Sequence, residues 1–317
     1  MLRFGRHRTL TALLCLAVIW STSFSLMNLA VQSIPPATVT AGRMALGAAI
    51  LWAVLALRGD ALPRDRGAWI GMGGVGLFGN ALPFFLITWG QQHIDSGVAA
   101  ILIAAMPLVT AMMAHWALAD ERITTRRALG IALGFAGIVV LVGPAALGRV
   151  GDDLAGTLAT LAAAVSFAVS VILARRFPPP SPTAGGTGSM LAGLLLILPV
   201  TLVMDLPFAA APTAASLAAT VALAVFPGAL AALLYFRIIF EAGAGYLAMT
   251  NYLVPVLAVL WGVMLLGEPM TSNAVGALVL ILAGISLAQL DDPAEAGSLT
   301  SPSLLMQQWG KERGNAS

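Results

Sequence analysis

The feature that most constrains this chain is a series of long apolar runs that recurs along nearly its whole length. A helix needs about 20 apolar residues to cross the bilayer core, and ten runs of that order follow one another. They cover residues 9–31, 36–57, 68–89, 96–117, 125–143, 153–175, 183–204, 214–238, 246–266 and 271–290. Because lipid cannot satisfy backbone polar groups, such runs cross a membrane as helices. The sequence predicts an all-α integral membrane protein with ten transmembrane helices.

The composition supports this prediction. Of 317 residues, 59% are hydrophobic and 9% are charged, whereas about a quarter of the residues of a soluble domain are charged. The first run follows three arginines, as in a secretory signal peptide, but it is too long for one and ends without a persuasive cleavage site. We therefore expect residues 9–31 to form an uncleaved first span.

Lysine and arginine residues predict the orientation, because they concentrate in cytoplasmic loops. With the N-terminus inside, 14 of the 16 fall in inner segments, and Arg149 alone falls in an outer one. The remaining cation, Arg43, lies within the second span. Both termini are therefore predicted to be cytoplasmic.

The two halves of the chain resemble each other. Pairs separated by a constant 143 residues are Ser23 and Ser166, Phe24 and Phe167, and Thr40 and Thr183. Five spans per half is an odd number, so the second copy must enter the membrane upside down, as in many secondary transporters. We expect a first repeat at 1–148, an inverted second repeat at 149–290, and a polar cytoplasmic tail at 291–317.

Each predicted repeat closes with a proline-bearing helix, an apolar run, a glutamate and a short glycine-bearing helix. The strings run from Pro107 through Trp116 to Glu121, and from Pro255 through Trp261 to Leu266-Gly267-Glu268-Pro269. Together with the two five-helix repeats, they resemble the EamA-type drug/metabolite transporters, and most of all the YddG-type aromatic amino-acid exporters. The resemblance implies a multi-pass carrier of a bacterial-type inner membrane, which exports neutral or aromatic amino acids by alternating access around a central cavity.

Polar and aromatic side chains within the spans are candidates for the substrate path, since polar groups at membrane depth usually face a cavity. The candidates are Trp20, Ser23, Phe24, Asn28, Arg43, Asn80, Phe84, Tyr235, Asn251 and Tyr252. Other roles stay open: Trp20 could simply pack between helices, and Asn80 could form an interhelical hydrogen bond. Arg43 could receive a substrate carboxylate or extend to the membrane surface.

Bending points and gates are predicted from prolines within the spans and from the two glutamates that end the fourth and ninth spans. These residues are Pro83, Pro107, Pro227, Pro255, Glu121 and Glu268. The glutamates could equally stabilise turns. Glycines of the fifth and tenth spans predict close helix packing, within the chain or in a homodimer.

Other functional classes find little support in the sequence. A membrane enzyme would need a nucleophile and a base within the spans, and no such pair is evident, so we expect no catalytic residues. No motif predicts a metal site, a cofactor or a nucleic-acid partner. The expected partners are a small-molecule substrate and the bilayer, in a monomer or homodimer. A lipid-carrier flippase, another metabolite carrier of the same superfamily and a sensor remain alternatives.

Overall fold

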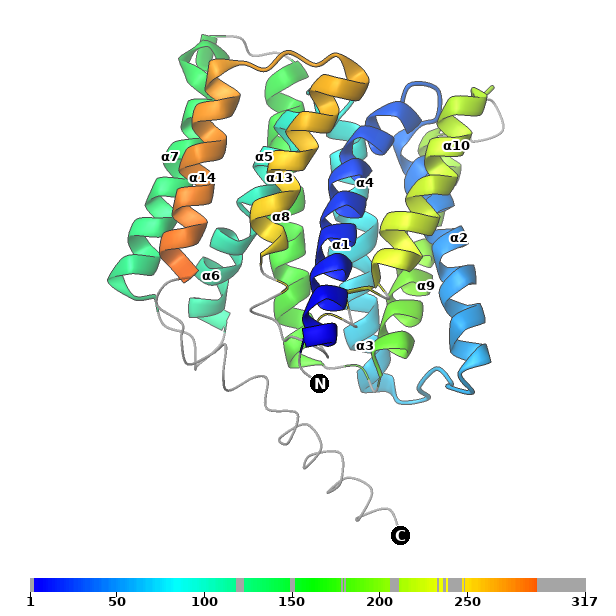
Figure 1. Ribbon diagram of the computed structural model, residues 1–317. Helices are drawn as coiled ribbons and strands as arrows, with labels where there is room; N and C mark the ends of the chain where they lie inside the picture. The colour runs from blue at the N-terminus through cyan, green and yellow to red at the C-terminus, as the bar shows by residue number, and fades with distance from the viewer. Residues whose placement is uncertain are drawn as a thin grey trace.

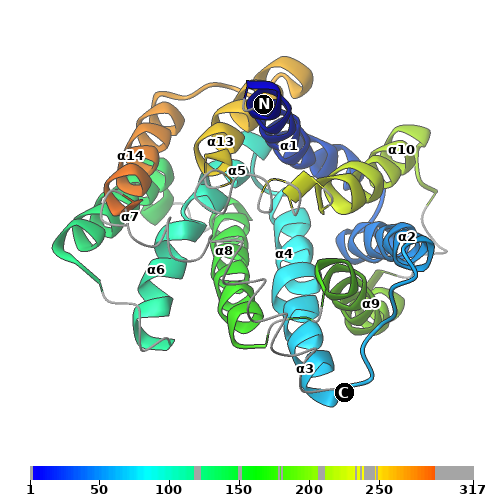
Figure 2. The same cartoon turned by 60° about the horizontal axis from the view of Figure 1, so that its bottom comes forward.

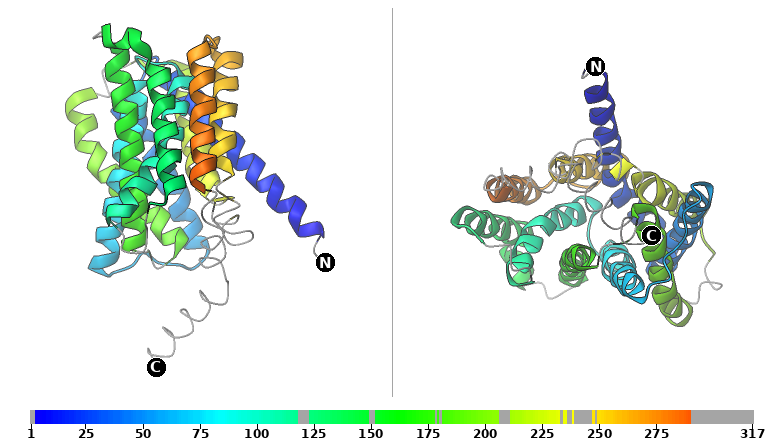
Figure 3. Two further views of the ribbon diagram at one scale, coloured as in Figure 1. Left: turned by 90° about the vertical axis from the view of Figure 1, so that its left-hand side faces the viewer. Right: turned by 90° about the horizontal axis from the view of Figure 1, so that it is seen from below.

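The computed structural model describes residues 3–117, 123–148, 152–177, 179, 181–205, 211–232, 234–235, 238, 247 and 249–289. Every regular element among these residues is a helix, and none is a strand. The helices run alongside one another in a single bundle (Figure 1). The first turns of α1 extend away from the other helices (Figure 3). The prediction of an all-helical protein is confirmed.

The first half of the chain contains α1 to α7 and one π-helix. Their bounds are α1 Arg3–Ala30, α2 Pro36–Leu57, α3 Arg66–Val75, η1 Gly76–Ala81, α4 Leu82–Gly90, α5 Ser96–Ala104, α6 Met106–Ala117 and α7 Thr125–Gly148. The second half contains the remaining helices. Their bounds are α8 Asp152–Arg176, α9 Pro182–Val200, η2 Thr201–Asp205, α10 Ala214–Leu223, η3 Ala224–Leu230, α13 Thr250–Trp261, η4 Gly262–Leu266 and α14 Ser272–Gln289.

Within the described residues, 6 helical stretches are long and apolar enough to cross a membrane. They are Thr9–Ala30, Pro36–Leu57, Arg66–Gly90, Ser96–Ala117, Leu154–Ala174 and Thr183–Asp205. Four shorter apolar helices accompany them, at Ala128–Leu141, Ala214–Leu230, Thr250–Leu266 and Ser272–Ala288. The chain is therefore a multi-pass membrane protein. The count of ten spans and the cytoplasmic termini stay predictions.

The helices of the two halves interleave. Helix α1 packs against α10 and α13 of the second half, and α8 packs against α4, α5 and α6 of the first half. Two further pairs join the halves directly, because α2 packs against α9 and α7 packs against α14 (Figures 1 and 2). Each half therefore buries its helix faces largely against the other half.

Prolines explain where several spans lose regular α-helical bonding, because proline has no N–H to donate. The fourth span is broken at Ala105, two residues before Pro107, and this separates α5 from α6. The π-helix η1 directly precedes α4, which carries Pro83 in its first turn, and η3 contains Pro227. The Ser166 hydroxyl of α8 donates to the carbonyl oxygen of Phe78 at 2.9 Å. That carbonyl lies five residues before Pro83, which has no N–H to complete the π-helical bond.

Helix α7 meets α14 through glycines that allow their backbones to approach. A Cβ atom built on Gly130 would lie 2.6 Å from the Gly284 carbonyl oxygen, and one built on Gly284 would lie 2.6 Å from the Gly130 carbonyl oxygen. No side chain fits in so small a space. These two glycines are therefore used in contact between helices of the same chain.

Candidate substrate site

Arg43 is a buried cation within a membrane-spanning helix. It lies on α2, seven residues past Pro36, which corresponds to roughly 10 Å along the helix axis at 1.5 Å per residue. Its side chain is 4% exposed. The guanidinium carbon lies 3.6 Å from the centroid of the Phe84 ring of α4, and Nη1 lies 3.8 Å from the Met27 sulfur of α1. The side chain therefore stays inside the bundle and does not extend to the membrane surface.

The contacts of Arg43 leave its charge only partly compensated. Removing an ion from water costs several kcal/mol even after the protein relaxes, whereas a desolvated cation–π contact returns about 2 kcal/mol. A thioether sulfur is a weak acceptor. Among the described residues, no carboxylate forms an ion pair with Arg43; its assigned partners are Phe84 and Met27. An anion at this position would be stabilised by charge-assisted hydrogen bonds.

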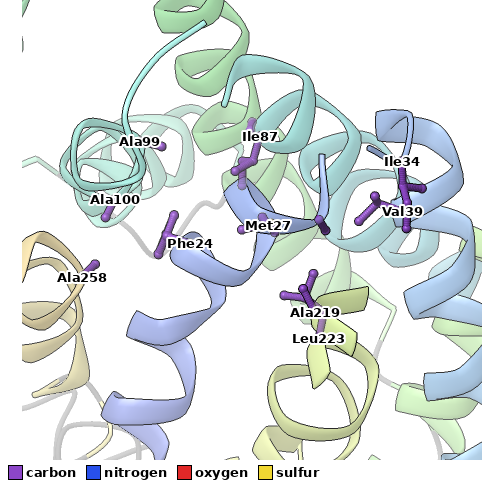
Figure 4. Packing of buried hydrophobic residues seen from close by; sticks show 12 residues of the cluster. Phe24, Met27, Ile34, Val39, Ile87, Ala99, Ala100, Ala219, Leu223 and Ala258 are labelled. Carbon is purple, nitrogen blue, oxygen red and sulfur yellow. The ribbon is translucent and has the colours of Figure 1, made fainter. Parts of the chain in front are cut away.

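Aromatic and apolar side chains from several helices surround Arg43. The Phe84 ring meets the Phe167 ring of α8 edge to face, with 5.6 Å between ring centroids. Met27 belongs to a buried cluster with Phe24 and Ile87, on which Phe84 and Phe167 also pack. Figure 4 shows Phe24 and Met27 of α1 and Ile87 of α4 among the buried residues of this cluster. The site around Arg43 therefore combines one cation with apolar walls.

A layer of hydrogen bonds lies one helical turn from Arg43, toward the end of the bundle that holds residues 31–35 and 91–95. We call this end the Gln91 end. The Thr40 and Thr88 hydroxyl oxygens lie 3.5 Å apart between α2 and α4. The Gln91 side-chain N–H donates to the main-chain carbonyl of Phe24 at 3.1 Å, and the Asn28 side-chain N–H donates to the main-chain carbonyl of Gln91 at 3.4 Å. These bonds join α1, α2 and α4 between Arg43 and the Gln91 end.

Two carboxylates of the second half close the Gln91 end further, because each binds the N-terminus of a first-half helix. Glu268 accepts hydrogen bonds from the backbone N–H groups of Ser96 at 2.7 Å and Gly97 at 2.9 Å, at the start of α5. Asp205 accepts from the Thr38 N–H at 2.6 Å, in the first turn of α2. Neither helix has a capping bond from its own N-cap side chain. Negative charge is favourable at a helix N-terminus, so both contacts hold the halves together.

Glycines place the Glu268 carboxylate. Gly267 has φ +69° and ends η4 in the left-handed conformation, which glycine adopts without strain. A Cβ built on Gly262 would collide with the Glu268 carboxylate, so this position must be glycine for the carboxylate to reach α5. The string Gly262 to Pro269, singled out in the sequence, therefore builds a contact between the two halves.

Trp20 lies on α1 at a different level from Arg43. Its ring centroid is 6.0 Å from that of Tyr235, with the two planes inclined at 47°. Both rings pack on a buried cluster formed by Leu13, Leu16 and Ile238 among others. Trp20 and Tyr235, each predicted separately for the substrate path, therefore meet across the two halves. Trp261 of α13 donates its indole N–H to the Ser21 hydroxyl of α1 at 2.9 Å.

The other predicted site residues are distributed over several contacts. Ser23 donates to the Trp20 carbonyl of its own helix at 2.6 Å. Asn80 lies on η1 and packs against α9. A Cβ built on Gly193 of α9 would lie 3.4 Å from the Cβ of Asn80. Tyr252 packs on the cluster between α5, α13 and α14, and forms a hydrogen bond with Ser286.

The remaining predictions have simpler positions. Asn251 is half-buried in the first turn of α13. Pro255 lies inside α13, which continues through it as one α-helix. Glu121 and the tail at 291–317 lie outside the described residues.

The structure thus brings Arg43, Phe84, Asn28 and Phe24 into one region, and it pairs Trp20 with Tyr235 separately. Phe167 of that region, and Gln91 and Asp205 of the Gln91 end, were not among the predicted site residues. Phe167 could have been found as the repeat counterpart of Phe24. Gln91 and Asp205 carried no signal beyond their position at the ends of apolar runs, because their partners lie far away in the sequence. Within the described residues, no group of three or more His, Cys, Asp or Glu side chains could hold a metal ion.

A bundle of membrane-spanning helices, interrupted within its spans and holding a buried cation, is the kind of fold that membrane transporters use. The profile of the EamA-like transporter family matches residues 7–143 and again residues 154–289. The chain belongs to this family and is a membrane transporter.

Relatives agree with the family assignment. The uncharacterized inner membrane transporter YedA of Escherichia coli is 27% identical over 290 residues, which cover 90% of this chain and 92% of YedA. A probable terminal-alkyne amino-acid exporter of Streptantibioticus cattleyicolor is 27% identical over 281 residues, covering 87% of this chain and 91% of the exporter. A solved crystal structure matches with a TM-score of 0.64 and 26% identity, covering 89% of this chain and 96% of that one.

Proposed function

We propose that this transporter is a secondary carrier that exports neutral and aromatic amino acids across a bacterial inner membrane by alternating access. The two halves would form an inverted repeat and rock against each other, so that a central site opens to one face of the membrane at a time. Pro83, Pro107, Pro227 and Pro255 would serve as bending points, and Glu268 as part of a gate.

The observation that carries the proposal is the equivalence of the contacts made by the two halves. If residues 1–148 correspond to 149–290, then α1 corresponds to α8, α3 to α10 and α6 to α13. The contacts of α1 with α10 and α13 are then matched by those of α8 with α3 and α6. The α2–α9 and α7–α14 pairs each join corresponding helices. Such an arrangement, with the family profile matching twice, supports two alternative states related by symmetry.

The choice of amino acids as cargo is supported by one relative and by the site. The Streptantibioticus relative is named as a probable amino-acid exporter. Arg43 offers a cation at membrane depth, next to the aromatic rings of Phe84 and Phe167. An aromatic amino acid carries a carboxylate that could bind the cation and an aromatic ring that could pack on these rings. The inner-membrane location is supported by the printed name of the Escherichia coli relative.

Counterflow in liposomes tests this function. Purified protein would be reconstituted into liposomes loaded with unlabelled phenylalanine, and entry of labelled phenylalanine, leucine and alanine would be followed with and without a pH gradient. We expect transient accumulation of phenylalanine that protein-free liposomes do not show. If no neutral amino acid accumulates in either condition, the exporter proposal fails.

Two tryptophan variants refine the test. Trp20→Ala removes the ring that meets Tyr235 and should lower counterflow at least about tenfold, the loss that corresponds to about 1.4 kcal/mol of binding free energy. Trp52→Ala is the matched control, because Trp52 is 61% exposed on the outside of the bundle. Equal counterflow by both variants would remove Trp20 from the substrate path.

A further inference from the structure

We propose that Arg43 is the specificity-determining residue for the cargo, and that it binds a carboxylate of the transported molecule in a bidentate manner. This inference rests on the proposed function, and it names the chemical class that the site takes: a monocarboxylate that carries an apolar or aromatic group. Arg43 would select by the acid group, and the neighbouring apolar side chains would accommodate the remainder.

The first step of the argument is that the Arg43 guanidinium is held in place but not neutralised. Phe84 lies under one face of its plane at 3.6 Å, and the Met27 sulfur lies 3.8 Å from Nη1. Stacking on a ring occupies a face of the guanidinium and leaves its edge, where the N–H groups point. Two parallel N–H groups at that edge match the two oxygens of a carboxylate.

The second step is that the repeat does not need this arginine for its packing. Thr40 and Thr183 correspond at an interval of 143 residues, so the counterpart of Arg43 is Gly186. A Cβ atom built on Gly186 would meet only Leu51, at an ordinary 3.6 Å. The second half therefore forms the corresponding helix without a cation. A charge that one half carries and the other omits is better explained by a ligand than by the scaffold, since a buried charge is costly unless it is paired.

The third step concerns the kind of anion. Of the 16 lysine and arginine residues, Arg43 is the one that lies well inside a predicted span, whereas the others lie at span ends or in connecting segments. One guanidinium balances the single charge of a carboxylate, whereas a phosphate dianion requires more positive charge. The neighbouring side chains Met27, Phe24 and Ile87 are apolar and buried. Together these features favour a carboxylate attached to an apolar group over a phosphorylated cargo.

Competition for binding tests the proposal on the full-length protein in detergent. Binding of labelled phenylalanine and of labelled 3-phenylpropionate is measured by scintillation proximity. Unlabelled phenylalaninamide, 3-phenylpropionate and phenyl phosphate serve as competitors. We expect phenylalaninamide, which lacks the acid group, to compete at least about tenfold more weakly than phenylalanine, as loss of a charged hydrogen bond predicts. Phenyl phosphate should also compete more weakly than 3-phenylpropionate.

Variants assign the selectivity to Arg43. Arg43→Gln should bind phenylalanine and phenylalaninamide within about threefold of each other, and Arg43→Lys should retain part of the preference for the acid. Arg58→Gln is the matched control, because Arg58 ends the same helix as an exposed residue. It should behave as the wild type. If Arg43→Gln does not yield a monodisperse protein, Arg43→Lys decides, because a preference for the acid equal to that of the wild type would overturn the assignment to Arg43.

The outcomes separate this inference from the proposed function. If phenylalanine is transported but phenylalaninamide competes equally well, the carrier stands and the carboxylate site is rejected. If 3-phenylpropionate binds through Arg43 while phenylalanine does not, the carboxylate site stands and the amino-acid cargo is rejected. Stronger competition by phenyl phosphate overturns the assignment to a carboxylate. If neither labelled ligand binds the wild type, the carboxylate site is rejected.

Discussion

At the scale of single residues, glycine decides where charged groups can reach. Gly262 lies directly against the Glu268 carboxylate, which caps α5. Arg43 shows the opposite case, in which a large side chain is buried without an anion among the described residues. The positions of the Glu268 carboxylate and of the Arg43 side chain depend on the space and charge around each of them. The hydrophobicity of the surrounding sequence does not predict either position.

Gly262→Ala tests the capping contact. The added methyl would displace the Glu268 carboxylate from the Ser96 and Gly97 N–H groups, and loss of a helix cap costs about 0.5–2 kcal/mol. We expect a lower midpoint of thermal unfolding in detergent. Gly73→Ala is the control, because a Cβ there meets nothing within 4 Å, and alanine favours helix formation. Equal midpoints for the two variants would contradict the contact.

At the scale of elements, each interrupted or closely packed helix depends on a particular neighbour. Helix α8 supplies the Ser166 hydroxyl that satisfies the Phe78 carbonyl beside the Pro83 interruption. Helices α7 and α14 approach through Gly130 and Gly284, where backbone meets backbone. A proline or a glycine in the sequence therefore marks such a place but does not identify the partner.

Ser166→Ala tests the first of these element contacts. It leaves the Phe78 carbonyl without the hydroxyl, and interhelical hydrogen bonds in membranes contribute about 0.6–2 kcal/mol. Unfolding in a denaturing detergent should show a loss of that size. Ser170→Ala is the matched control, because Ser170 bonds to a carbonyl of its own helix. A Ser166→Ala protein as stable as Ser170→Ala would show that the hydroxyl contributes nothing.

Gly284→Ala tests the contact between α7 and α14. The new methyl would lie 2.6 Å from the Gly130 carbonyl oxygen, so the helices must separate, and we expect a loss of about 1–3 kcal/mol. At Gly276 of the same helix a Cβ would lie an ordinary 3.5 Å from Val140, so Gly276→Ala should be neutral or slightly stabilising. The same denaturing-detergent titration compares the two, and equal stabilities would argue against close backbone packing.

At the scale of the whole molecule, the Gln91 end is joined by hydrogen bonds between the two halves. Glu268 and Asp205, both from the second half, bind first-half helices at their N-termini. The Thr213 N–H donates to the Ser33 hydroxyl at 3.0 Å at the same end. In a carrier that rocks between two states, these contacts must break for the Gln91 end to open.

Glu268→Gln should therefore favour opening of the Gln91 end. An amide cannot offer two anionic oxygens to the N-terminus of α5, so the contact weakens by about 0.3–2 kcal/mol. Spin labels on cysteines at the exposed positions Gln92 and Met270, in a Cys15→Ser background, should show a shift toward longer distances. Asp65→Asn is the control, since Asp65 caps its own helix at Ala68. Unchanged distances in Glu268→Gln would exclude the gate role.

The sequence by itself determined that this is a membrane protein, because long apolar runs of this kind cross a bilayer as helices. It also indicated the family, through the strings that contain Glu121 and Glu268. It also marked Arg43 and Phe84 as unusual, since charge and aromatic rings stand out against apolar spans. Only the tertiary structure decided that Phe84 lies under Arg43, that Asp205 binds Thr38, and that Tyr252 packs away from Arg43 against α14. These contacts join residues far apart in the chain, and helical periodicity specifies which residues share a face but not which helix that face meets.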